Sequence, residues 1–305
     1  GFAVGVFTVF FDVAYQSYLP SLVKREQLVE GNSKLEVSRS GAQIAGPGLA
    51  GVLIAALTAP YAVLADALSF VASALCLSRI RRHEVPVSTG ERLPMRAEIV
   101  EGLRYVFTHP ILRPSMAFVA TSNFFGTLLT SVVLVFAVRE LHLSAATIGL
   151  TFALSNIGFL AGALSANRLS RRFGVGRVLV GAAAFGGWAL LLIPLATEAV
   201  AVPFLVAAFF VFGFCAIVYN VTGISLMQAI TPERLLGRMN ASRRFVVWGV
   251  IPIGMLIGGA IGDRVGLREA MWVGALGASI AFLPLLVSPV RAIVGMPVDG
   301  DDYGA

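Results

Sequence analysis

Residues 203–225 read PFLVAAFFVFGFCAIVYNVTGIS, an apolar run without a charged side chain. A helix needs about 20 such residues to cross the hydrocarbon core of a bilayer. Lipid offers no hydrogen-bond partners to the backbone, so a run of this length is predicted to be a membrane-spanning helix. The alternating pattern of a membrane β-barrel does not occur in the sequence.

Eight further runs of this kind occur along the chain. Together they predict nine spans, at roughly 1–22, 38–58, 61–78, 115–138, 146–167, 177–196, 203–225, 245–262 and 269–290. The composition agrees, because the 305 residues are 57% hydrophobic and only 13% charged, with a mean hydropathy of +0.84. Soluble proteins are typically ~45–50% apolar and ~25% charged. The sequence therefore predicts an all-α integral membrane protein.

The basic residues fall almost entirely on one side of these spans. Of the 23 Lys and Arg residues, all follow spans one, three, five, seven and nine except Arg139, Arg264 and Arg268. Cytoplasmic loops carry this excess. We therefore expect a multi-pass protein of the cell (plasma) membrane with a cytoplasmic C-terminus and with Arg81, Arg171 and Arg243 facing the cytoplasm. The topology accounts for the net charge of +6, so no nucleic-acid partner is expected.

The chain resembles itself at an offset of 208 residues. Asp12 meets Asn220, and Asn32 in a loop meets Asn240. Three glycines of the second span, Gly41, Gly46 and Gly51, match three of the eighth in register, namely Gly249, Gly254 and Gly259. The offset pairs spans one to three with spans seven to nine and leaves spans four to six without partners.

The missing partners predict three more spans, beginning about 95 residues upstream of Gly1, and two parallel six-helix halves, as in many secondary transporters. Residues 1–78 would then complete the N-terminal half, 79–114 form a cytoplasmic linker, 115–290 form the C-terminal half and 291–305 a cytoplasmic tail. Apolar residues at helical spacing in the linker predict an amphipathic helix, either on the inner membrane surface or in solvent: Ile99, Leu103, Val106 and Phe107.

The stretches Tyr18–Val23, Asn32–Gly51 and Ala65–Phe70 resemble the major facilitator superfamily, and within it the exporters of siderophores and macrolides. The resemblance covers essentially the whole chain, which matches family helices four to twelve. It implies a monomeric antiporter for the proton-coupled efflux of an amphiphilic small molecule, drug-like or siderophore-like. Its expected partners are the lipid bilayer and the substrate. The energy source would be an ion gradient, expected to be protons, and no cofactor is expected.

The first motif behind this resemblance lies on the second span. It is Gly41-x4-Gly46-Pro47-x2-Ala50-Gly51, similar to the family's antiporter motif with Ala50 in place of one glycine. Small side chains let a facing helix approach closely, and Pro47 lacks the N–H of a regular helix, so a bend is predicted there. The alternative is generic packing of small residues without bearing on transport direction.

The second motif follows the fifth span. It is Gly162-Ala-Leu-Ser-Ala-Asn167-Arg168-Leu-Ser-Arg171-Arg172, which resembles the degenerate second copy of the family's cytoplasmic loop motif. Asn167 stands where the family has an acid. The resemblance also implies that Asp12 pairs with an arginine of the first copy, which is expected upstream of Gly1.

Four ionisable residues lie in or beside the predicted spans, and such groups are candidates for charge coupling because they are costly in lipid: Asp12, Glu36, Arg39 and Asp66. Glu36 and Arg39 are three residues apart, hence on one helix face, where they could pair. The pair could equally anchor a helix at the membrane boundary. Asp66 lies near the start of a span, where a helix N-terminus favours an anion.

The resemblance implies that family helices four, seven and ten line a cavity. On the matching spans the candidate cavity residues are Tyr15, Gln16, Asn123, Phe124, Phe125, Tyr219 and Asn220. An aromatic lining with few charges suits a large, partly apolar substrate. The two cysteines and three histidines lack metal-ligand spacing, so no metal site is expected.

Other functions stay open. An importer or symporter would use the same fold. A membrane enzyme is disfavoured, because the spans hold no His pair or His–carboxylate cluster and the stretch 174–177, Gly-Val-Gly-Arg, lacks the Gly-Lys-Ser/Thr of a phosphate-binding loop. A non-transporting membrane protein is disfavoured by the repeat, since duplicated halves around a central site are a transport device.

Overall fold

The computed structural model describes residues 19, 23–24, 27–57, 64, 68–75 and 95–296, with the backbone alone at 43–57, 95–99, 145–146 and 233. Within these residues every element is a helix, which confirms the all-α prediction. In chain order they are α2 (Leu28–Leu57), α4 (Met95–Thr108), α5 (Leu112–Arg139), α6 (Ala145–Phe173), α7 (Val175–Ala189), α8 (Leu192–Leu195), η2 (Glu198–Val200), α9 (Ala201–Ile230), α10 (Glu233–Arg264), α11 (Leu267–Ile280), α12 (Leu283–Leu286) and η3 (Pro289–Ala292).

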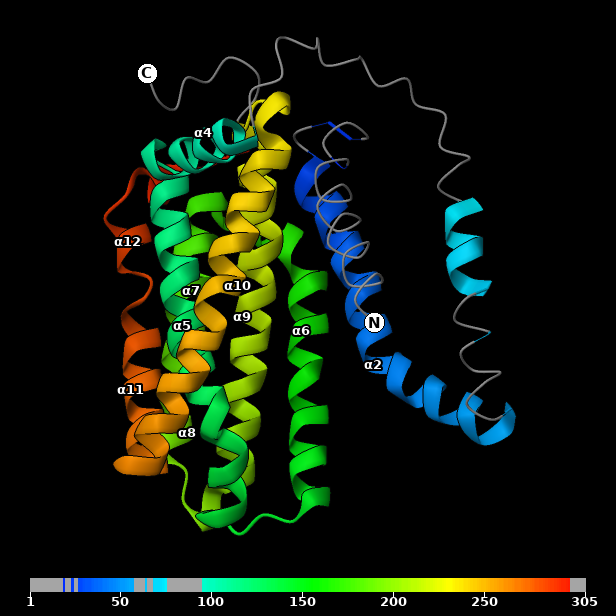
Figure 1. Ribbon diagram of the computed structural model, residues 1–305, viewed down its shortest axis with the longest axis vertical. Coiled ribbons are helices and arrows are strands. Elements are labelled where there is room, and N and C mark those ends of the chain that lie inside the picture. Colours follow the sequence, from blue (N-terminus) through cyan, green and yellow to red (C-terminus); the bar gives the residue numbers. More distant parts are fainter. Residues whose placement is uncertain are drawn as a thin grey trace.

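Six helical segments of the described part are long and apolar enough to cross a membrane, from Leu112–Arg139 to Leu267–Leu286. They correspond to the fourth to ninth predicted spans. Figure 1 shows them side by side in one bundle, with α2 alongside α6 and α4 lying across one end. The first predicted span falls mainly outside the described residues, and of the third only residues 64 and 68–75 are described.

Many large apolar side chains lie exposed on the outside of this bundle. Large side chains such as Phe245, Leu256 and Val287 are 74–81% exposed. In water a surface of this kind would drive aggregation, whereas lipid tails cover it without cost. The exposure pattern therefore agrees with the composition in describing a protein built for a bilayer.

Several helices extend beyond the apolar runs that predicted them. The prediction began the second span at residue 38, but α2 begins at Leu28. The prediction began the eighth span at residue 245, but α10 begins at Glu233. The prediction ended the fifth span at 167, but α6 continues to Phe173 and turns into α7 at the single residue Gly174. Its φ of +87° suits glycine. Hydropathy locates the part of a helix that lies in lipid, and backbone hydrogen bonding continues past it.

Glycines set the spacing between neighbouring spans. A Cβ at Gly158 or Gly162 of α6 would collide with the carbonyl oxygens of Phe210 and Phe214 on α9. The same holds at Gly254 of α10, where a Cβ would meet the backbone of α5. Because lipid gives no hydrophobic drive for helices to associate, such close packing is what holds spans together.

One arginine side chain contacts three segments at the end of the bundle opposite α4. Arg268, in the first turn of α11, donates through Nη1 to the carbonyl oxygens of Pro194 (2.7 Å) and Ala196 (3.1 Å). Its Nε lies 3.3 Å from a carboxylate oxygen of Glu140, and its guanidinium lies 4.9 Å from the ring centre of Phe136. The ends of α5, α8 and α11 are thereby fixed together.

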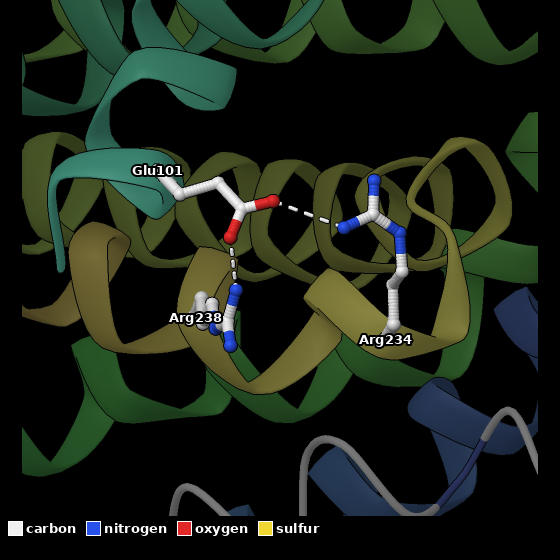
Figure 2. A network of polar contacts seen from close by, with 3 residues as sticks. All are labelled: Glu101, Arg234 and Arg238. Atoms are coloured by element: carbon white, nitrogen blue, oxygen red, sulfur yellow. Dashed lines mark hydrogen bonds and ion pairs between the residues drawn. The ribbon is translucent and has the colours of Figure 1, made fainter. Parts of the chain in front are cut away.

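The linker helix α4 is fixed to the bundle by a comparable contact (Figure 2). One carboxylate oxygen of Glu101 accepts from Nη1 of Arg234 at 2.9 Å, and the other accepts from Arg238. The Tyr105 hydroxyl donates to the carbonyl oxygen of Ile230 at 3.1 Å. Val106 is fully buried against the bundle, so this part of the linker packs on the ends of α9 and α10.

The remaining residues of the predicted amphipathic face differ in exposure. Leu103 is partly buried, Phe107 is exposed, and the side chain of Ile99 lies outside the described residues. One edge of α4 therefore packs on the protein while an apolar edge with Val100 and Phe107 remains uncovered. The placement of that edge at the membrane surface stays a prediction.

We predict that Gly258→Ala destabilises the protein by about 1–3 kcal/mol, since overpacking costs this much. The new methyl group would collide with the Leu128 carbonyl oxygen and the Ser131 hydroxyl on α5. Gly259→Ala is the matched control, because no heavy atom of the described residues lies within 4 Å of the Cβ position there. Thermal unfolding in detergent checks the pair, and equal melting temperatures would contradict the packing described.

We predict opposite membrane sides for Arg171, at the end of α6 near α4, and Arg264, at the far end of α10. On a background lacking Cys76 and Cys215, a cysteine at 264 should react with an impermeant maleimide in intact cells. A cysteine at 171 should react only after the cells are opened, because the basic excess lies inside. Labelling of position 171 in intact cells would show that the protein has the opposite orientation in the membrane.

Candidate functional site

A cavity of about 460 Å³ is lined mainly by helices of the bundle, and α2 contributes to one side of it. Ligand sites for drug-sized molecules typically measure about 300–1,000 Å³. Six helices supply its walls: α2 through Glu36 and Arg39, α5 through residues from Phe118 to Thr130, α6 through Phe159, α7 through Ala182, Ala183, Gly186 and Gly187, α9 through residues from Phe212 to Met227, and α10 through Arg243 and Val247.

The α5 wall follows helical periodicity. Its lining residues are spaced by three or four positions, as one face of a helix requires: Val119, Ser122, Asn123, Gly126, Thr127 and Thr130. The Asn123 amide nitrogen donates to the Val119 carbonyl oxygen at 2.7 Å, and the Thr127 hydroxyl donates to the Asn123 carbonyl oxygen at 2.6 Å. The wall is therefore polar without being charged.

The α9 wall combines apolar, aromatic and amide groups. Tyr219 is largely buried, and its ring centre lies 4.4 Å from that of Phe118 on α5. Asn220, beside it, lines the cavity, as do the thiol-bearing Cys215 and the apolar Ile224. The ring contact joins two walls of the cavity, and the amide of Asn220 provides a polar position between apolar ones.

Charged side chains gather where α2 and α10 meet the cavity. The Glu36 carboxylate lies 3.9 Å from an Arg39 nitrogen, and the two side chains are 12% and 64% exposed respectively. From α10, Nη2 of Arg243 donates to Oδ1 of Asn220 at 3.1 Å. Two guanidinium groups and one carboxylate therefore line the same cavity.

Hydrogen bonds join α2 to the bundle one helical turn before Glu36. The Asn32 amide nitrogen donates to Ser225 Oγ at 2.9 Å and to Gln228 Oε1 at 2.8 Å, both on α9. On the next residue, the Ser33 hydroxyl donates to the Ala163 carbonyl oxygen of α6. These contacts hold α2 against α6 and α9 at the end of the bundle that carries α4.

Five of the sequence-predicted site residues meet at this cavity. They are Glu36, Arg39, Asn123, Tyr219 and Asn220. The neighbouring aromatics of α5 are placed elsewhere. The ring of Phe125 packs against Gly277 of α11, and the Phe124 ring stands edge-on to it with centres 5.0 Å apart. Successive helical residues point about 100° apart, so a run of three cannot share one face.

The antiporter-like motif lies within α2. That helix continues without a break through Gly46, Pro47, Ala50 and Gly51, and Figure 1 shows it changing direction along its length. No heavy atom of the described residues lies within 4 Å of the Cβ position of Gly41. The motif thus forms a continuous, bent helix, as a proline within a span permits.

The loop-like motif lies in the last turns of α6. Gly162 allows the close approach to α9 described above, Asn167 is partly buried, and Arg168 and Arg171 are exposed. The Arg172 guanidinium lies 5.4 Å from the ring centre of Phe173. The motif is therefore helical rather than a loop, and it lies at the end of the bundle that carries α4.

Four predicted site residues lie outside the described residues, namely Asp12, Tyr15, Gln16 and Asp66. Sequence reasoning missed Arg243, because a hydropathy window assigned it to a cytoplasmic loop. It also missed Ser122, Thr127 and Thr130, which the helical spacing from Asn123 could have identified. In the described part of the chain, no group of three or more His, Cys, Asp or Glu side chains could hold a metal ion.

Two curated relatives and one solved structure extend these findings. The chain is 28% identical over 293 residues to "Multidrug efflux pump Tap" of Mycolicibacterium fortuitum, covering 91% of this chain and 70% of that protein. It is 24% identical over 270 residues to "Uncharacterized MFS-type transporter YfmI" of Bacillus subtilis (strain 168), covering 87% of this chain and 66% of that protein. It therefore spans about two thirds of the length of each.

The solved structure is that of a bacterial homologue of the iron transporter ferroportin in an outward-facing state. It matches with a TM-score of 0.73 at 20% identity, over 90% of this chain and 67% of that one. This likeness concerns the fold. The family profile of the Major Facilitator Superfamily matches residues 116–295, more than half of the chain, and the chain belongs to that family of membrane transporters.

Proposed function

We propose that this chain carries the substrate pathway of a secondary active transporter that exports an amphiphilic small molecule in exchange for protons. The observation that carries the proposal is the cavity of about 460 Å³, which is lined by five helices of the bundle and by Glu36 and Arg39 of α2. Its walls combine aromatic rings with amides, hydroxyls and a few charges. Sites between the two halves of a transporter can open to either side as the halves rock.

Export rather than import is supported by two observations. The relative from Mycolicibacterium fortuitum is named a multidrug efflux pump, and the motif from Gly41 to Gly51 resembles the family's antiporter motif. An importer or symporter of the same fold is the alternative. Substrate transport into vesicles with a pH gradient of either sign distinguishes the two functions. An antiporter moves substrate against the proton flux, whereas a symporter moves it with the flux.

Glu36 is our candidate for the proton-binding group. Its carboxylate faces the cavity, is only 12% exposed, and has Arg39 3.9 Å away. An ionisable group in the interior of a membrane protein is commonly part of an ion or proton pathway. A substrate that enters the cavity would change the surroundings of this carboxylate, which gives substrate binding a way to affect proton release.

We predict that Glu36→Gln lowers efflux driven by a pH gradient at least tenfold while exchange of substrate without a gradient continues. The amide keeps the shape of the side chain but cannot release a proton. Uptake of a fluorescent substrate into inverted vesicles measures the first activity, and counterflow measures the second. Glu198→Gln, at an exposed position in η2, is the control. Gradient-driven transport at the normal rate in the Glu36 variant would exclude this residue as the coupling group.

We also predict that Gly46→Leu abolishes transport while the protein still inserts into the membrane. Its repeat counterpart Gly254 packs directly against the α5 backbone, so the repeat predicts an equally tight contact for Gly46. Overpacking costs about 1–3 kcal/mol, and transporter conformations can differ by a few kcal/mol. A penalty borne by one conformation would therefore trap the other.

Gly249→Leu is the matched control for this prediction. Gly249 is the counterpart of Gly41, and in the part of the chain that the structure describes no heavy atom lies within 4 Å of its Cβ position. Both variants are reconstituted into vesicles, and their transport rates are normalised to the amount of inserted protein. Wild-type rates in the Gly46 variant would mean that the motif has no part in the transport cycle.

A further inference from the structure

The charges that line the cavity are unbalanced. Glu36 supplies one negative charge, while Arg39 and Arg243 supply two positive ones. The carboxylate can compensate Arg39 alone, from 3.9 Å. No other charged side chain lines the cavity among the described residues, so their charges leave it with a positive excess.

Arg243 carries the excess positive charge of the cavity lining. It is partly buried, and the structure gives it a hydrogen bond to Asn220 at 3.1 Å. Among the described residues no carboxylate forms an ion pair with it. A charge inside a membrane protein is costly unless a partner compensates it. A neutral amide satisfies one N–H group of the guanidinium and leaves its charge in place.

The contact with Arg243 also fixes the orientation of the Asn220 amide. A guanidinium donates hydrogen bonds and accepts none, so Asn220 must direct its carbonyl oxygen toward Arg243. The amide NH₂ group of Asn220 then has two donors, and no side chain or carbonyl group among the described residues accepts a hydrogen bond from them. Arg243 and Asn220 therefore present donors side by side on the cavity wall, an arrangement suited to an oxyanion.

We infer that Arg243 and Asn220 bind the anionic group, such as a carboxylate, of an amphiphilic substrate. Apolar side chains around this pair, including Phe118, Ile224 and Val247, would receive the hydrophobic part of the same molecule. The inference rests on the proposed transport function and narrows its substrate to organic anions. Charge-assisted hydrogen bonds from arginine give the selectivity, because they are about twice as strong as neutral ones.

Three probes with one fluorophore and different charge test this inference: anionic dansylglycine, cationic dansylcadaverine and neutral dansylamide. Their affinities are measured by fluorescence titration of the purified full-length protein in lipid nanodiscs. We expect dansylglycine to bind about tenfold or more tightly than dansylamide. Arg243→Gln should remove that difference and leave the affinity for dansylamide unchanged. Arg243→Lys should retain part of it, because the charge remains.

Arg264→Gln is the control, since it removes a positive charge from the exposed far end of the same helix. Preference of the wild type for the cationic or neutral probe would overturn the inference. So would an absence of dansylglycine binding, or an equal loss of all three affinities in Arg243→Gln. The efflux assays test transport separately, so a protein that pumps only cations would refute the anion site and leave the proposed function intact.

Discussion

Close approach of helix backbones at glycine is the constraint on which this structure depends. The contacts of Gly158 and Gly162 with the α9 backbone place α6 directly against α9, and those of Gly254 and Gly258 place α10 against α5. Lipid supplies no hydrophobic drive for these pairs, so their stability comes from van der Waals contact over a short distance. Because α5, α9 and α10 also carry most of the cavity lining, the same contacts fix the relative positions of its walls.

The cavity walls combine small residues with polar ones. Ala182, Ala183, Gly186 and Gly187 of α7 leave space at the cavity, and polar side chains of α5 and α9 line it. Asn123 and Thr127 satisfy part of their hydrogen-bonding capacity on their own helix, which keeps the α5 wall polar at little desolvation cost. Arg243 has no carboxylate partner among the described residues and bonds to the amide oxygen of Asn220. This incomplete compensation is the basis of the anion site that we propose.

The sequence predicted the fold more fully than the site. Hydropathy located α5 to α11 because lipid contact demands long apolar runs, and the repeat at offset 208 matched Gly46 with Gly254, which lies at a tight helix contact. Helix ends were misplaced at α6 and α10, since hydrogen bonding continues beyond the hydrocarbon. Asn123, Tyr219 and Asn220 were predicted as cavity residues from family resemblance. Arg243 was not, because its charge suggested a loop, and Phe124 and Phe125 were assigned together with Asn123 although successive helical positions face different neighbours.

The contacts beside the cavity differ from the glycine seams in a way that bears on movement. Asn32, Ser225 and Gln228 join α2 to α9 through neutral hydrogen bonds, and water can replace such bonds when helices separate. A neutral hydrogen bond contributes only about 0.5–1.5 kcal/mol net, whereas separating the interlocked backbones of α6 and α9 would lose many van der Waals contacts at once. In the described structure, the polar contacts between α2 and α9 are thus easier to exchange for water than the glycine contacts between α6 and α9. Rigid seams within the bundle and exchangeable hydrogen bonds beside it are what a cavity requires if it is to open without losing its walls.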